Sequence, residues 1–160
     1  MRYKQCAFLV LLLWIPLLAN SQSWEPKDAR LMSRFAEEVD PDSVLPEYPR
    51  PQMVRDRWLN LNGVWEFQVA NQSWGQPPED GWNRSILVPF AVESALSGIK
   101  EHHERILYRR TFTIPEDWSG NRILLHFGAV DYQTEVFING TSIGTHQGGY
   151  NPFSMDITPE

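Results

Sequence analysis

The chain has 160 residues, with 42% hydrophobic side chains and a formal net charge of −6. This length and apolar content suffice for one packed domain, and the acidic balance argues against a nucleic-acid partner because an acidic surface repels a phosphate backbone. Aromatic residues make up 12% of the chain, with 7 Trp, and favour packed β structure or sugar stacking over disorder.

The first 21 residues have the features of a secretory signal peptide. Arg2 and Lys4 give a positive start, residues 6–18 are almost wholly apolar, and residues 19–21 offer small side chains for cleavage. The alternative is an uncleaved membrane anchor, but a spanning helix needs about 20 apolar residues and this run is shorter. We therefore expect export to the periplasm or the extracellular space, and no membrane contact after cleavage.

Cleavage would also remove the only cysteine, Cys6. The mature chain would then have no disulfide and no thiol chemistry. Because Arg2 and Lys4 would leave as well, the formal net charge would fall from −6 to −8.

Residues 22–57 are predicted to be a proline-rich lead-in arm. Proline lacks the backbone donor and interrupts helices and sheet ladders, and five occur here: Pro26, Pro41, Pro46, Pro49 and Pro51. Between the first two, Asp28 could cap a short helix whose Leu31, Phe35 and Val39 share one face. The alternative is an extended arm that the same apolar side chains attach to the body.

From residue 58 to residue 160 the pattern changes to short β segments separated by turn residues. Trp65, Phe67 and Val69 alternate with polar residues, as in a strand with one buried face. Six further segments suit strands: 86–88, 107–114, 123–127, 135–138, 142–145 and 153–157. Asn139 and Gly140 lie between two of these segments and predict a two-residue type I′ hairpin turn, because both central positions need a positive φ.

About seven short strands without a strong helix predict an all-β antiparallel sandwich. Jelly rolls commonly have eight strands in two Greek keys, so a jelly roll over residues 58–160 is expected to be incomplete at its C-terminal end. The segment 153–157 would then leave an apolar sheet edge open to pairing or aggregation.

Candidate catalytic carboxylates are badly spaced for glycoside cleavage, which usually needs two of them about 5 to 9.5 Å apart. Asp131 and Glu135 would be about 13 Å apart on an extended chain, and Asp131 suits a turn before a strand. Glu37 and Glu38 are neighbours on the possible helix, where adjacent side chains diverge toward solvent. These candidate pairs are therefore poor matches to either glycosidase geometry.

His102 and His103 could suggest a metal site. Adjacent side chains on extended backbone point to opposite faces, however, and neither a cysteine nor a spaced third ligand accompanies them. No metal and no cofactor are expected.

The glycine-rich segment after the hairpin is a candidate sugar-binding loop. His146, Gln147 and Tyr150 offer polar groups and an aromatic ring, while Gly148 and Gly149 free the backbone between them. The alternative is that the glycines only turn the chain and that Tyr150 packs in the core.

The tryptophans divide into two groups. Trp74 and Trp82 lie in Gly- and Pro-rich sequence and could be exposed, so that a sugar ring could stack on them. Trp58 and Trp65 border the first predicted strand and suit the core.

Seven motifs in order resemble glycoside hydrolase family 2. They are YPRPQ at 48–52, WLNLNGVWEF at 58–67, VPFAVES at 88–94, YRRTF at 108–112, FGAVDY at 127–132, the Asn-Gly hairpin, and HQGGYNPFSMDIT at 146–158. The last is especially similar to β-glucuronidases. Related β-galactosidases carry an acidic pocket residue in this loop, where the present chain has Gly148.

The resemblance implies a galactose-binding-like jelly roll, the N-terminal sugar-binding domain of such enzymes. It further implies an immunoglobulin-like domain and a (β/α)₈ barrel with two catalytic glutamates, neither of which these residues contain. The chain alone is therefore expected to be inactive, with carbohydrate as its partner and His146, Gln147 and Tyr150 at the rim of a pocket.

Two other functions remain open. One is a freestanding carbohydrate-binding module, which Trp74, Trp82 and the loop around His146 would serve. The other is a structural or interaction β-sandwich that uses its open sheet edge.

Overall fold

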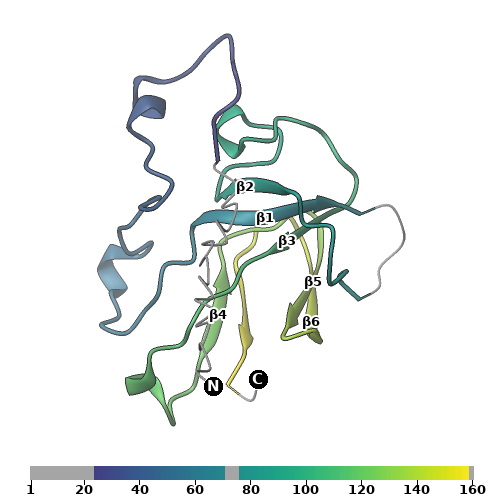
Figure 1. Cartoon of the computed structure of the whole chain (residues 1–160). Coiled ribbons are helices and arrows are strands. Elements are labelled where there is room, and N and C mark those ends of the chain that lie inside the picture. Colours follow the sequence, from purple (N-terminus) through teal and green to yellow (C-terminus); the bar gives the residue numbers. More distant parts are fainter. Residues whose placement is uncertain (1–23, 71–75, 159–160) are drawn as a thin grey trace, which may run out of the picture.

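The computed structural model describes residues 24–70 and 76–158 (Figure 1). The predicted signal peptide and Trp74 lie outside these ranges. Within them no helix is long and apolar enough to cross a membrane.

The described residues are all-β, as predicted. The seven strands are β1 (Gly63–Val69), β2 (Arg84–Val88), β3 (Ile106–Arg109), β4 (Leu124–Phe127), β5 (Gln133–Ile138), β6 (Thr141–Gln147) and β7 (Phe153–Asp156). Four short 3₁₀ helices accompany them: η1 (Arg34–Glu38), η2 (Pro51–Met53), η3 (Ala95–Ser97) and η4 (Glu116–Trp118). Each of the seven predicted strand segments overlaps one observed strand.

The strands form three antiparallel sheets that together have the character of a jelly-roll sandwich. One sheet has the order β2-β1-β3, and the other two pair β4 with β7 and β5 with β6 (Figure 1). The β5–β6 hairpin closes through Asn139 and Gly140, with φ values of 49° and 83°. This geometry confirms the predicted turn, because both central residues have the positive φ that a type I′ turn requires.

The main core lies on the three-stranded sheet around Phe67, whose side chain is fully buried. Ile86, Val92 and Ile99 complete the buried cluster, and partly buried residues from β1, β2 and β3 pack against it. Trp65 is one of them, as predicted, and its Nε1 donates to the carbonyl of Leu61 at 2.7 Å. Trp58 packs instead on Tyr48, with ring centroids 5.0 Å apart.

β3 is shorter than the predicted segment 107–114 because Arg110 leaves the ladder. Its guanidinium donates to the carbonyls of Leu61 and Asn62 at 3.1 and 2.9 Å, and to that of Val64 on β1 at 3.4 Å. The Arg110 side chain therefore binds the Val64 carbonyl on β1, which a backbone amide of a longer β3 would otherwise use. Burial at this position lowers the pKa of Arg110 from its ordinary value.

The arm contains no α-helix, so the predicted helix is wrong. Only the five-residue η1 forms, and its cap is Ser33, whose Oγ accepts from the Phe35 amide at 3.2 Å, rather than Asp28. Leu31 is 92% and Phe35 58% exposed, so these side chains do not attach the arm to the body either.

Other contacts attach the arm at two places. At one end, Trp24 Nε1 donates to the Leu96 carbonyl and the Lys27 amide to the Ala95 carbonyl, both at 3.0 Å. Farther along, the buried Val44 presents its carbonyl to the Asn60 amide group at 3.2 Å. The arm thus adheres to the turn around η3 and to the chain that enters β1.

A polar cluster edges the core. Arg84 donates twice to Glu101, at 3.0 and 2.6 Å, and His103 lies 2.8 Å from the same carboxylate. The hydrogen bonds from Arg84, and then from His103, lower the pKa of Glu101 to about 2. Because the pair lies at the surface, its contribution to stability is screened by solvent.

Replacing Phe67 by Ala should lower the free energy of unfolding by about 3–5 kcal/mol, because it removes a fully buried ring and leaves a cavity. Urea unfolding followed by tryptophan fluorescence measures the change. Phe35→Ala is the matched control, since that ring is 58% exposed and its loss should cost far less. Equal effects of the two substitutions would contradict the placement of the core.

Gly98→Ala should destabilise the chain more than Gly120→Ala does. Both glycines have a positive φ, 81° and 78°, so each alanine is strained by about 1 kcal/mol. Only at Gly98 would the new Cβ also meet another residue, 2.7 Å from Trp24 Cδ1. Urea unfolding gives the difference, and hydrogen exchange at the Lys27 amide should accelerate in Gly98→Ala alone. Unchanged exchange there would contradict the contact between Trp24 and Gly98.

Glu101 should stabilise the fold above about pH 4.5, the ordinary pKa of a glutamate, and lose this effect as the pH falls toward 2. Its pKa is lowered in the folded chain, so the unfolded chain binds more protons in that range. The urea midpoints of wild type and Glu101→Gln should therefore differ near neutral pH and converge near pH 2. A difference that does not depend on pH would show that the carboxylate is not the cause.

Candidate functional site

The chain before β5 and the chain that leaves β6 meet beside the β5–β6 hairpin and form what we call the loop site, made of Asp131, Tyr132, Gln147 and Tyr150. The Gly148 amide donates to the Tyr132 carbonyl at 2.8 Å and so joins the chain after β6 to the chain before β5. Gly148 has a φ of 131°, a conformation that side chains disfavour. The glycine therefore permits this junction.

Asp131 packs closely on the second glycine of the loop. A Cβ placed on Gly149 would lie 2.5 Å from Asp131 Oδ1, so only glycine fits there without a shift. Asp131 lies in the loop before β5, where the sequence predicted a turn residue, and the peptide bond that joins it to Tyr132 is cis.

The three predicted rim residues differ in environment. Gln147 is exposed and Tyr150 is 96% exposed, so Tyr150 does not pack in the core. His146 is half-buried, and its ring stacks on Phe153 with centroids 4.0 Å apart. Phe153 in turn stacks on Phe127 at 4.7 Å. The structure thus brings Gln147 and Tyr150 to the surface and places His146 in a stack of three rings.

His146 and its cross-strand neighbour Thr134 have unused hydrogen-bonding capacity. The two residues face each other in the register of β5 and β6. Both His146 Nε2 and Thr134 Oγ1 are buried and, among the described residues, have no hydrogen-bond partner. Buried polar atoms normally have one, so this pair can accept a further polar contact beneath the loop site.

Trp82 does not offer the free ring that the sequence suggested. Its Nε1 donates to the Pro78 carbonyl at 2.9 Å, and the Arg109 guanidinium lies 4.5 Å from its ring centroid. Arg109 is held there by Glu66, to which its second terminal nitrogen donates at 2.9 Å. One face of Trp82 is therefore closed to a sugar.

Sequence reasoning missed Tyr132, which is 59% exposed at the loop site. The sequence singled out its neighbour Asp131, as a carboxylate and as a turn residue. The signal that could have found Tyr132 is its place between a turn residue and a predicted strand, where an aromatic side chain has no partner on the sheet.

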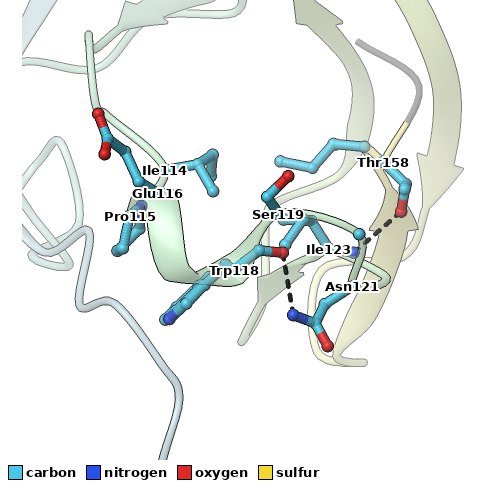
Figure 2. Close-up of a pocket in the computed structure, with 10 residues that line it drawn as sticks. Ile114, Pro115, Glu116, Trp118, Ser119, Asn121, Ile123 and Thr158 are labelled. Atoms are coloured by element: carbon cyan, nitrogen blue, oxygen red, sulfur yellow. Dashed lines mark hydrogen bonds between the residues drawn. The ribbon is translucent and has the colours of Figure 1, made fainter.

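A separate hollow lies between η4 and the ends of β4 and β7 (Figure 2). Its volume is about 510 Å³, and Ile114, Ile123 and Ile157 contribute apolar walls. Its polar groups are partly engaged, since Thr158 Oγ1 accepts from the Ile123 amide at 2.9 Å and the Asn121 side chain donates to the Trp118 carbonyl at 3.0 Å. Among the described residues, Glu116 is the only carboxylate that lines this hollow, so these residues provide no pair there for glycoside cleavage.

The other candidate groups do not assemble a catalytic or metal site. Glu135 Oε1 accepts from Ser142 Oγ at 2.6 Å across the hairpin. His102 and His103 contact different carboxylates and have 82% and 19% exposed side chains. Throughout residues 24–70 and 76–158, no three His, Cys, Asp or Glu side chains gather so that they could hold a metal.

The loop site contains no lysine or arginine. No Lys or Arg follows Arg122 up to residue 160. The four residues of the loop site provide two tyrosine rings, an amide and the Asp131 carboxylate.

Comparison with known proteins agrees with the fold. Residues 83–159 match the sugar-binding domain of the glycosyl hydrolases of family 2. The chain is 29% identical over 120 residues to a β-glucuronidase of Paenibacillus borealis and 31% identical over 128 residues to that of Canis lupus familiaris. Each match covers 69% of this chain, and 20% and 19% of the respective relative.

Solved structures give the same result. An uncultured Clostridium sp. β-glucuronidase is 30% identical with a TM-score of 0.50, and the match covers 61% of this chain and 19% of that one. A Bifidobacterium dentium β-glucuronidase complexed with coumarin-3-O-glucuronide is 28% identical with a TM-score of 0.52, over 61% and 17% of the two chains. The chain thus spans about a fifth of the length of these relatives, and it carries the sugar-binding domain of the family 2 glycosyl hydrolases.

Proposed function

We propose that the chain is the N-terminal sugar-binding part of an exported family 2 β-glycosidase, in which a barrel domain outside these residues hydrolyses the O-glycosyl bond. The observation that carries this proposal is the match of residues 83–159, on a fold with the expected strands. The resemblance to these enzymes implies that catalysis belongs to a barrel domain, which supports this division. Export rests on the leader-like residues 1–21.

In this function the loop site contributes to the rim of a sugar pocket. The ring faces of Tyr132 and Tyr150 suit the C–H face of a pyranose, and Gln147 and Asp131 suit its hydroxyl groups. His146 supports the loop from beneath through its stack on Phe153. A domain with these groups positions a substrate and leaves the chemistry to the barrel.

The side chains of the loop site suit a neutral sugar better than a uronic acid. A uronate carboxylate is usually bound by Arg or Lys, and the sequence has neither after Arg122. Asp131 would in addition repel it. If the longer enzyme acts on a glucuronide, residues outside the loop site must bind the carboxylate.

A second candidate is a freestanding carbohydrate-binding module. The 96% exposure of Tyr150 favours it, because an aromatic ring in solvent can bind sugar without help from another domain. The two candidates differ in affinity: a rim should bind a sugar weakly by itself, and a module should bind it firmly.

The purified chain should not hydrolyse nitrophenyl β-glycosides and should bind methyl β-galactoside more strongly than methyl β-glucuronide, with both affinities in the millimolar range, about −4 kcal/mol. Amide shifts in ¹H–¹⁵N spectra measure the binding and should centre on Gln147 and Tyr150. Tyr150→Ala should abolish the shifts, whereas Leu31→Ala, an exposed substitution on the arm, should leave them.

Turnover by a preparation free of contaminating enzyme would contradict the proposed division of labour. Micromolar binding would favour the freestanding module. Shifts that persist in Tyr150→Ala would remove the loop site from sugar binding, whichever of the two functions holds.

A further inference from the structure

The sequence contains the dipeptide Asn-Gly twice, at residues 62–63 and at residues 139–140. Asparagine is chemically labile, and most so before glycine, because no side chain shields the backbone nitrogen of a glycine. That nitrogen can attack Cγ of the asparagine side chain that precedes it. The structure places the two dipeptides in opposite environments, so they should differ in this reaction.

The first dipeptide is held at the start of the central strand of a sheet. Gly63 is buried and pairs with Val88 on β2. The side-chain amide of Asn62 donates to the Val44 carbonyl at 3.4 Å, and its backbone carbonyl accepts from Arg110 at 2.9 Å. A Cβ placed on Gly63 would lie 3.0 Å from Arg110 Nη1. The Asn62 side chain therefore cannot turn toward the Gly63 nitrogen unless the first sheet opens.

The second dipeptide is the turn of the β5–β6 hairpin. Asn139 and Gly140 are both exposed. Among the described residues, a Cβ placed on Gly140 would meet no atom within 4 Å beyond its two chain neighbours. Water therefore reaches this dipeptide, and the space around the glycine leaves both residues room to move.

The reaction at this second dipeptide requires the turn to open. In a type I′ turn the asparagine side chain and the following nitrogen point away from each other across the Cα–C bond, so that ring closure needs a different ψ. In the described part of the chain, β5 and β6 pair only with each other, as the separate hairpin in Figure 1. Two strands alone are marginally stable, so the free-energy cost of opening the turn is low.

We propose that Asn139 is a site of spontaneous deamidation in this chain, and that opening of the hairpin turn controls its rate. The Gly140 nitrogen loses its proton and forms a bond to Asn139 Cγ. The bond between Cγ and the side-chain nitrogen breaks, and ammonia leaves with a proton. Water then opens the resulting succinimide: cleavage at Cγ gives aspartate, and cleavage at the backbone carbonyl carbon gives isoaspartate.

The isoaspartate product should disturb only one end of the hairpin. It adds a methylene carbon to the backbone, so the chain no longer fits the two-residue turn that pairs Ile138 with Thr141. The loop site lies at the other end, where Gln133 pairs with Gln147. The amide signal of Gln147 should therefore stay in place while the turn is modified.

Incubation of the ¹⁵N-labelled chain at mildly alkaline pH tests the proposal, because alkali removes the glycine amide proton. Side-chain amide signals in ¹H–¹⁵N spectra report on each asparagine separately. The Asn139 signal should disappear at least about tenfold faster than that of Asn62, since opening the hairpin turn costs less than opening the first sheet. The backbone signal of Gly140 should move at the same rate as Asn139 is lost.

Two variants test the opening step. Val136→Ala removes part of a buried side chain from β5, and Ser142→Ala removes the hydrogen bond that Ser142 donates to Glu135 across the hairpin. Each should speed the loss of Asn139 at least about twofold, because each weakens the hairpin, and leave Asn62 as slow as before. The exposed Ser142→Ala variant decides the question if Val136→Ala does not fold.

Asn139→Gln is the matched control. Glutamine has the same amide on a longer side chain, which closes a ring onto the following nitrogen far more slowly, so the Gly140 signal should stay in place. Loss of Asn62 as fast as that of Asn139 would overturn the proposal. So would an Asn139 signal that persists under conditions that convert a peptide of residues 136–143. A rate that neither folded hairpin variant changes would exclude control by opening of the turn.

Discussion

The fold of the described residues depends on the burial of one ring, that of Phe67. β1 is the central strand of its sheet, and Phe67 pairs with Arg84 on β2 and with Tyr108 on β3. The ring of Tyr108 meets it edge-on with centroids 5.8 Å apart, and the guanidinium of Arg84 lies 5.3 Å from its centroid. Phe67 thereby gathers side chains from both neighbouring strands, and the turn that holds the arm follows β2 directly.

The first sheet and the remaining strands are stabilised by different kinds of side-chain contact. Around the first sheet, guanidinium and carboxylate groups edge the apolar core, as Arg84 and Glu101 show. On β4, β6 and β7 there is instead a stack of three rings, those of Phe127, Phe153 and His146. The main apolar core therefore lies on the first sheet, whereas the loop site lies at the end of the β5–β6 hairpin.

The strands could be predicted because their signals are local. Asn139 and Gly140 need only their own φ values to close a hairpin, and the alternation around Phe67 needs only one buried face. The arm could not be predicted in the same way. Leu31, Phe35 and Val39 have helical spacing, but spacing does not show whether the chain offers a surface against which a helix can pack.

The candidate site could be predicted only in part, because some of its contacts join residues that are distant along the chain. Gly148 and Gly149 indicate a loop, and the exposure of Tyr150 agrees with that interpretation. Arg110 shortens β3 and Arg109 covers Trp82 through contacts with residues that are distant along the chain. Such contacts of long side chains leave no periodic trace in a sequence, so the length of β3 and the accessibility of Trp82 appear only in the structure.

The absence of Lys and Arg after Arg122 has a consequence for how the domain responds to proteases. Trypsin cuts after these residues unless proline follows, and the exposed arm offers it several, including Arg34, Arg55 and Arg57. The whole of β4 to β7, with the loop site, offers none. A tryptic digest of this domain therefore reports on the arm and the first sheet, and leaves residues 123–160 as a single peptide whatever their state of folding.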